Sequence, residues 1–295
     1  MREIINHDIK KIQKLSLKIL KDDQFQSIER LGGMTNHSYH VRTAKHDLVF
    51  RLPGDGTEGI INRENEIVAN RLASALNIDT QILYIDTSGQ KITPYIQDAI
   101  TMDPFSMRRI DNIQLAAQVF KTLHQCQVNT HIPFDVAGTA REYEKCIEAN
   151  EVAFFDDYAV YKEIFLDLQQ QFHLADEQLV PCHNDPLCEN WIRSKDRMYL
   201  IDWEYAGMND PLWDLADLSI EADYNHEQDH TLLYHYFQFE PTAEIWQRFF
   251  ANKVFIDYLW SLWGLARIPY DPSMLTYGQE RYARMKKNLE LVKQA

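Results

Sequence analysis

Three side chains in the second half of the chain have the types and spacing needed for phosphoryl transfer. Asp185 and Asn190 stand five positions apart in CHNDPLCEN, and Asp202 follows in LIDWEY, after a strand-like run. Such a reaction needs one carboxylate to orient the attacking hydroxyl group, and oxygen ligands to hold magnesium against nucleotide phosphates. On this loop Asp185 can face the nucleophile, while Asn190 and Asp202 reach one metal ion from two sides.

The joint pattern is more specific than its parts. An Asp-x-x-x-x-Asn segment arises easily by chance, and carboxylates in turns usually hydrogen-bond locally. Protein kinases, however, use the same order of catalytic-loop Asp, Asn and hairpin-terminal Asp. We interpret His183, two positions before Asp185, as a brace of the loop. A zinc site from Cys182, His183 and Cys188 is disfavoured, because no second ligand pair accompanies them.

The elements around this centre fall into a β-rich front and a helical remainder. Short β-branched and aromatic runs predict strands, and apolar residues at helical spacing predict helices. The front is expected to contain a helix over 4–20, strands over 25–31, 38–43 and 47–52, a helix over 62–76, and a hairpin of 81–86 with 90–95.

From residue 110 onward the chain is mostly helical, with helices expected over 110–125, 140–150 and 243–266. A hairpin of residues 191–193 and 198–202 interrupts them, next to the catalytic residues. The fold class is therefore α+β, with a small β-rich N-terminal lobe over 1–97 and a larger helical lobe over 98–295.

Composition excludes several classes of function. The formal net charge is −14, which argues against nucleic acid as a partner and is compatible with a cationic substrate. The sequence contains no 18-residue apolar run, and its first residues, MREIINHDIKK, lack the apolar core of a signal peptide. The four cysteines are unpaired in pattern, so we expect reduced thiols and a cytoplasmic protein.

Longer motifs carry a resemblance to a known family. The sequence resembles the choline/ethanolamine kinase and aminoglycoside phosphotransferase superfamily, and within it the bacterial Lic-type choline kinases. The likeness extends over nearly the whole chain and implies a bilobal protein-kinase-like fold. The motifs that carry it are LGGMTNHSY (31–39), GTEGIINRENE (56–66), HNDPLCEN (183–190), LIDWEYAGMNDPLWDLA (200–216) and LWSLW (259–263).

The resemblance implies roles for residues in the N-terminal part of the chain and around the catalytic loop, with ATP and Mg²⁺ as cofactors. Asp185 corresponds to the catalytic base, and Asn190 and Asp202 to the magnesium ligands. Glycines let a backbone approach phosphates closely, although a Gly-Gly turn between strands is also an ordinary hairpin. The implied nucleotide-phosphate loop consists of Gly32, Gly33, Met34, Thr35 and Asn36.

One position departs from the family pattern. Kinases of this fold usually carry a lysine in the third strand to hold the nucleotide phosphates, but here Arg51 occupies that place. Arginine keeps its charge and can grip phosphate bidentately, so the role can survive. Its helix partner by the family pattern is Glu66, with Glu64 as the alternative, and a solvated helix face is the competing interpretation. No Walker motif is present.

The aromatic residues bear on the acceptor. Trp260 and Trp263 are three apart in a helical stretch and share a face, which is more often core than cage. By resemblance, this pair walls a choline site, because aromatic faces hold a quaternary ammonium that offers no N–H donors. Tyr205 and Tyr277 resemble further cage positions, and Glu204 could add negative charge near the cation.

The leading hypothesis is therefore an ATP-dependent choline kinase. Ethanolamine would favour carboxylates over a closed aromatic cage, and an aminoglycoside would need a wide acidic groove. A catalytically inactive binding module is the alternative of another class, and it predicts loss of Asp185, Asn190 or Asp202, which are all present. Asp214, in WDLA, is expected either to add charge near the substrate or to brace the catalytic loop.

Overall fold

The computed structural model describes residues 2–31, 36–54, 62–175 and 178–294. Two compact units make up the chain: unit 1 is Met1–Thr101 with Asn190–Ala206, and unit 2 is Met102–Glu189 with Gly207–Ala295. The segment that returns to unit 1 carries both predicted metal ligands. The predicted division into lobes over 1–97 and 98–295 stays a prediction. It assigns Asn190–Ala206 to the second lobe.

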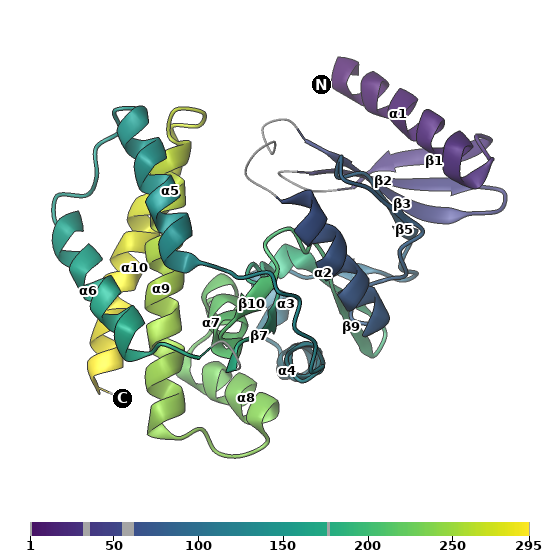
Figure 1. Ribbon diagram of the computed structural model, residues 1–295. Helices are drawn as coiled ribbons and strands as arrows, with labels where there is room; N and C mark the ends of the chain where they lie inside the picture. Colours follow the sequence, from purple (N-terminus) through teal and green to yellow (C-terminus); the bar gives the residue numbers. More distant parts are fainter. Residues whose placement is uncertain (1, 32–35, 55–61, 176–177, 295) are drawn as a thin grey trace. The chain divides into compact units, whose positions relative to one another are not determined.

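Unit 1 is built on a five-stranded antiparallel sheet (Figure 1). Its three long strands and its hairpin lie where the hydrophobic patterns predict them. In spatial order the strands are β1 (Phe25–Arg30), β2 (Asn36–Thr43), β3 (Asp47–Pro53), β5 (Lys91–Pro94) and β4 (Tyr84–Ile85).

Helix α1 (Arg2–Leu20) covers one face of this sheet and closes the core of unit 1. Ile12 of α1 is buried in one cluster with Phe50 and Leu52 of β3. Side chains alternate along a strand, so Arg51 points to the opposite face. There its guanidinium contacts Glu66 of helix α2 (Arg63–Ala75). The sheet therefore separates an apolar face from a charged face.

A smaller sheet completes unit 1 and presents the metal-ligand segment. Its order is β6 (Ile100–Thr101), β8 (Trp191–Ser194) and β9 (Arg197–Leu200), with β8 and β9 forming a tight hairpin. The backbone N–H of Leu200 donates to the carbonyl of Ile78, 2.9 Å away, which ties the hairpin to the segment after α2. Asp202 lies two positions after the end of β9, in the left-handed region with φ 69°.

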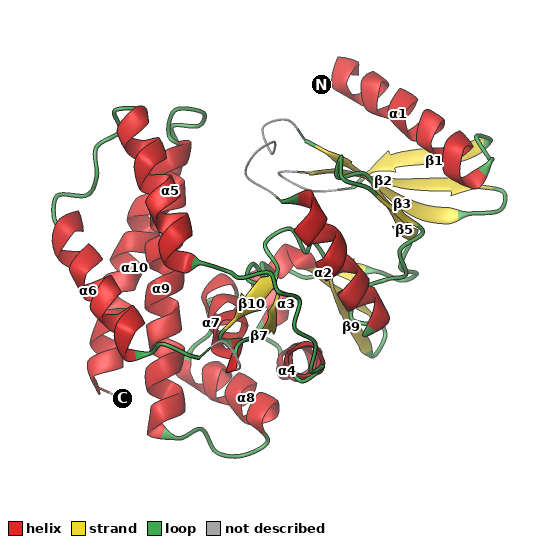
Figure 2. Cartoon of the chain, in the orientation of Figure 1, coloured by secondary structure: helices red, strands yellow, loops and turns green. Residues whose placement is uncertain are grey.

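Unit 2 is mainly helical (Figure 2). Helix α9 is buried on every side from Phe249 to Leu262, as expected for a helix that neighbours surround. Figure 1 shows α10 running beside it. The helices are α3 (Pro104–Met107), α4 (Ile110–His124), α5 (Val136–Ala149), α6 (Tyr158–Gln171), α7 (Pro211–Glu221), α8 (His226–Phe237), α9 (Ala243–Arg267) and α10 (Met274–Gln294).

A two-stranded ribbon in unit 2 leads into the catalytic loop. Strand β7 (Val180–Cys182) pairs with β10 (Gly207–Asn209), and α7 begins directly after β10. Asp210 caps α7, since its carboxylate accepts the N–H of Leu212 at 2.9 Å, and Pro211 occupies the first turn. Within the described part of the chain, no helix has the length and apolar character needed to cross a membrane.

Candidate active site

Asp214 holds the catalytic loop by its backbone. The side chain of Asp214 is fully buried at the start of α7, and its two oxygens accept the N–H groups of His183 and Asn184, each at 2.8 Å. The carboxylate thus fixes the two residues that precede Asp185. The two roles expected for Asp214 are to add charge near the substrate or to brace the catalytic loop, and these hydrogen bonds are those of a brace.

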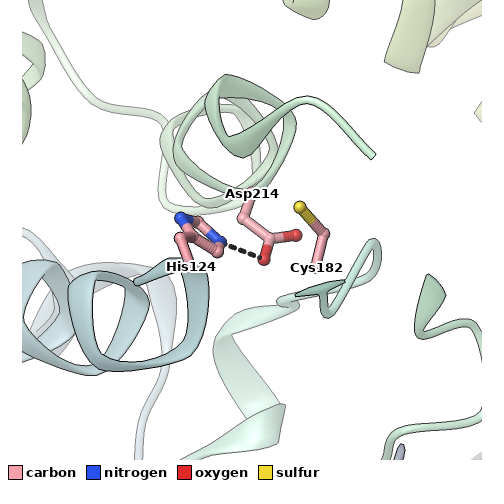
Figure 3. Close-up of side chains that lie close together, drawn as sticks. All are labelled: His124, Cys182 and Asp214. Carbon is pink, nitrogen blue, oxygen red and sulfur yellow. Dashed lines mark hydrogen bonds and ion pairs between the residues drawn. The ribbon is translucent and has the colours of Figure 1, made fainter. Parts of the chain in front are cut away.

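His124 extends this brace into the core of unit 2 (Figure 3). Its Nε2 lies 3.0 Å from an Asp214 oxygen, and its Nδ1 lies 2.9 Å from the Tyr236 hydroxyl group. Because a carboxylate only accepts, Nε2 donates to Asp214, and in that neutral tautomer Nδ1 accepts from the Tyr236 hydroxyl group. The sequence pattern did not single out His124, which lies 90 positions from Asp214.

Cys182 lies beside these two residues and makes the trio a possible metal cluster. Among the described residues, His124, Cys182 and Asp214 form the one group of this kind. However, Asp214 already binds two backbone N–H groups and the imidazole. Burial also raises the pKa of the Cys182 thiol well above its usual value, which disfavours the thiolate that a metal would need. We therefore interpret the group as a brace.

Replacing His124 by Ala is expected to loosen this brace. The change removes two buried hydrogen bonds and should lower the free energy of unfolding by about 2–3 kcal/mol and kcat by roughly tenfold. Urea denaturation and steady-state kinetics measure the two effects. Thr122→Ala, an exposed change on the same helix, is the control. An unchanged kcat in a destabilised His124 variant would contradict the positioning role.

Other contacts fix the loop further. Asn184 adopts a left-handed conformation with φ 67°, an uncommon state for a residue other than glycine. Its side-chain oxygen accepts from Asn209 at 2.9 Å, and its carbonyl accepts from the Trp213 indole at 3.1 Å. The backbone N–H of Asp185 donates to the His183 ring at 3.3 Å. His183 thus contacts the loop from within, in the place expected for a bracing residue.

The predicted cage residues of helices α9 and α10 lie together in unit 2. The ring centroids of Trp260 and Trp263 are 6.3 Å apart, and those of Trp263 and Tyr277 are 5.6 Å apart, both with edge-to-face geometry. Trp260 is buried and Trp263 half-buried. A Cβ on Gly264 would lie 3.0 Å from Gly278 backbone atoms, so the missing side chains let the two helices approach closely.

Tyr143 of α5 lies within electrostatic range of Tyr277. Burial raises the pKa of Tyr143, and the charge of Asp185 and the neighbouring Tyr277 act in the same direction. Burial raises the pKa of Tyr277 as well, and Asp185 again contributes. Both phenols therefore lie within electrostatic range of the predicted base. No motif pointed to Tyr143, because its position depends on how α5 packs against α9.

In unit 1 the β8–β9 hairpin places the two predicted metal ligands close in space. The carbonyl of Asn190 accepts the N–H of Ile201 at 2.9 Å, directly before Asp202. The Asp202 side chain is 28% exposed, so a ligand can reach its carboxylate. An amide and a carboxylate oxygen on adjacent backbones form a donor set that suits Mg²⁺. The residues present therefore fit the implied metal.

Arg51 lies on the charged face of the sheet between two carboxylates. Its guanidinium pairs with Glu66, the partner that the family pattern indicates, and Nη1 lies 3.2 Å from Asp202. Burial alone would lower the pKa of Arg51, but the charges of Glu66 and Asp202 outweigh it, so the pKa is raised. Lys91, opposite Arg51 in the register with β5, instead donates to Asn70 at 2.8 Å.

Glu204 also belongs to this charged group. Its carboxylate accepts from Asn36 at 3.2 Å and lies 3.7 Å from the Arg63 guanidinium. Burial, with a smaller contribution from Asp202, raises its pKa to about 7. The contact with Asn36 places Glu204 beside the end of the predicted phosphate loop, and its predicted role toward the acceptor stays a prediction. Gly32, Gly33, Met34 and Thr35 lie outside the described residues.

The structure thus forms two groups from the predicted residues. The group in unit 1 contains Asn36, Arg51, Glu66, Asn190, Asp202 and Glu204. The group in unit 2 contains Trp260, Trp263 and Tyr277, and the charge of Asp185 acts on the Tyr277 hydroxyl group. Tyr205, the remaining predicted acceptor residue, lies in unit 1.

Comparison with known proteins identifies the family. Residues 27–258 match the choline/ethanolamine kinase family. Protein LicA of Haemophilus influenzae is 29% identical over 272 residues, which cover 88% of this chain and 79% of LicA.

Two solved structures are also similar. A choline/ethanolamine kinase family protein from Mesorhizobium loti has a TM-score of 0.83 at 32% identity, covering 97% of this chain and 100% of that one. Choline kinase LicA from Streptococcus pneumoniae has a TM-score of 0.80 at 31% identity, covering 96% and 99%. Both support the predicted protein-kinase-like fold. The chain therefore belongs to the choline/ethanolamine kinase family of small-molecule kinases.

Proposed function

We propose that this chain is an ATP- and Mg²⁺-dependent choline kinase that forms phosphocholine. The observation that carries the proposal is the aromatic group of Trp260, Trp263 and Tyr277 in the same unit as Asp185. A quaternary ammonium has no N–H to donate, so aromatic faces are its natural binding surface. The Trp263 ring already lies next to one cation, because the Arg267 guanidinium is 5.9 Å from the centroid of this ring.

Asp185 is the proposed base. Its carboxylate orients the choline hydroxyl group and accepts the proton as that oxygen attacks the γ-phosphorus of ATP, and the bond from phosphorus to the β,γ-bridging oxygen breaks to release ADP. The brace from Asp214 keeps the loop in place, which limits the motion of the base during transfer.

The residues of unit 1 hold the nucleotide in this proposal. Asn190 and Asp202 supply oxygen ligands for Mg²⁺, which neutralises phosphate charge when bound. Arg51 binds the nucleotide phosphates, and its contact with Glu66 limits the orientations of the guanidinium. The support for these roles is the arrangement of the charged face together with membership of a kinase family.

A comparison of acceptors tests the proposal. We expect choline to give a higher kcat/KM than ethanolamine or a kanamycin-type aminoglycoside in a competition assay with limiting ATP. Trp263→Ala should raise the KM for choline by about 30-fold, since a desolvated cation–π contact contributes about 2 kcal/mol. The KM for ATP should change less than about twofold, because the tryptophan lies in the acceptor group.

Trp246→Ala is the matched control for this experiment. It removes the same side chain from the same helix, 17 positions and about 25 Å along the helix axis from Trp263. Trp246 packs against His226 and Phe250, so its loss should affect stability and leave the KM for choline unchanged. Preference for ethanolamine, or an unaltered choline KM in the Trp263 variant, would refute the cage.

A further inference from the structure

Asp217, in the middle of α7, is a buried carboxyl group that the proposed chemistry does not use. The residue is fully buried, and within the described part of the chain neither of its side-chain oxygens has a hydrogen-bond partner. Buried carboxyl groups are almost always paired, because an unpartnered one loses its hydration without compensation. Asp214, one turn earlier, satisfies both oxygens. Asp217 therefore differs from its neighbour and requires an explanation.

Charges on three elements surround Asp217. Burial raises its pKa well above the usual value, and Glu221, Asp185 and Asp214 act in the same direction, while Arg281 opposes them. Arg281 offsets only part of this rise in pKa, because its guanidinium already pairs with Glu221 and with Asp257. Burial and the neighbouring carboxylates therefore favour the protonated form of Asp217.

The acceptor group lies within reach of this carboxyl group. The Arg281 guanidinium lies 5.0 Å from the centroid of the Tyr277 ring and also pairs with Glu221, which follows Asp217 by one turn of α7. The charge of Asp217 correspondingly contributes to the raised pKa of Tyr277, which is due mainly to burial. A cation that binds against Tyr277 would favour the ionised form of Asp217, since an opposite charge lowers the cost of ionisation. The interaction needs no contact, because charges act strongly across a buried region of low dielectric constant.

We propose that Asp217 is the buried counter-charge for the ammonium group of a cationic amino-alcohol acceptor. The inference rests on the proposed function and adds how the same site selects charged alcohols over neutral ones. On acceptor binding, the Asp217 proton passes to solvent, and the carboxylate that remains balances the bound cation. A neutral alcohol of the same shape leaves Asp217 protonated, so its binding receives no electrostatic stabilisation from this residue.

A pair of acceptors with the same shape tests the proposal. 3,3-Dimethylbutan-1-ol replaces the ammonium nitrogen of choline by carbon and is otherwise its neutral analogue. In Asp217→Asn we expect the KM for choline to rise about tenfold and the KM for the neutral alcohol to change less than about twofold. Asp223→Asn is the control, since it removes a charge two positions after the end of the same helix, from a side chain that is 86% exposed.

A second measurement uses the unaltered protein. Calorimetric titration in two buffers of different ionisation enthalpy should detect release of a proton on binding of choline and none on binding of 3,3-dimethylbutan-1-ol. Equal heats in the two buffers with choline would overturn the proposal, and so would an equal rise of both KM values in Asp217→Asn. If the unaltered protein did not phosphorylate choline at all, the proposed function itself would fail, which is a distinct result.

Discussion

Asp185→Asn is expected to lower kcat with choline by about 10³-fold and to leave both KM values within about threefold. The amide has the shape of the carboxylate but cannot accept the proton of the attacking hydroxyl group. The fold should not suffer, because asparagine has the size and shape of aspartate, and Asp214 holds the two preceding residues. ADP release in a coupled assay measures the rate.

Glu189→Gln is the matched control for this prediction. Glu189 is an exposed acid four positions further along the same loop, so the variant makes the same chemical change without touching the proposed base. Its kcat should stay within about twofold of the unaltered protein, as expected for an exposed surface change. A kcat for Asp185→Asn equal to that of the control would remove Asp185 from the role of base.

The parts of the site that the sequence predicts are those fixed by local structure. Asn190 and Asp202 come together because a tight hairpin joins them, and both its strands are visible as β-rich runs. Arg51 is predictable in the same way, because strand alternation places it opposite its apolar neighbours. In each case short-range periodicity determines where the side chain points.

The parts that escape prediction depend on packing between distant segments. His124 braces the catalytic loop only through Asp214, and Tyr143 comes within range of Tyr277 only through the packing of α5 against α9. Helix α5 also begins at Val136, four positions before the predicted start, because Asp135 caps it by accepting the Gly138 N–H at 2.8 Å. The cap outweighs the low helix propensity of a glycine in the first turn.

Asp217 shows the same limit most clearly. In the sequence PLWDLADLSIE, Asp217 is one of several acidic residues, and acidic residues are rarely buried without a partner. The sequence alone therefore predicts an exposed side chain on a surface helix. Only the packing of α9 and other neighbours against α7 reveals that Asp214 and Asp217 are both buried in unit 2. Among the described residues, Asp214 has hydrogen-bond partners for both oxygens and Asp217 has none.

Asp202→Asn should cause the second-largest loss, about 10²–10³-fold in kcat at a fixed low concentration of Mg²⁺. The amide keeps one oxygen ligand but loses the negative charge that attracts the cation. Added Mg²⁺ should restore part of the rate, so the midpoint of the magnesium activation curve should move to at least about tenfold higher concentration. The variant also weakens the contact with Arg51, now 3.2 Å from Asp202.

Two comparisons separate loss of the metal from loss of that contact. Asp196→Asn alters an exposed acid in the turn of the same hairpin and should leave the activation curve in place. Arg51→Ala should raise the KM for ATP without moving the magnesium midpoint, because the arginine binds phosphate in our proposal and the metal ligands remain. If Asp202→Asn showed the activation curve of the Asp196 control, Asp202 would not be a metal ligand. Its carboxylate would then act only through Arg51.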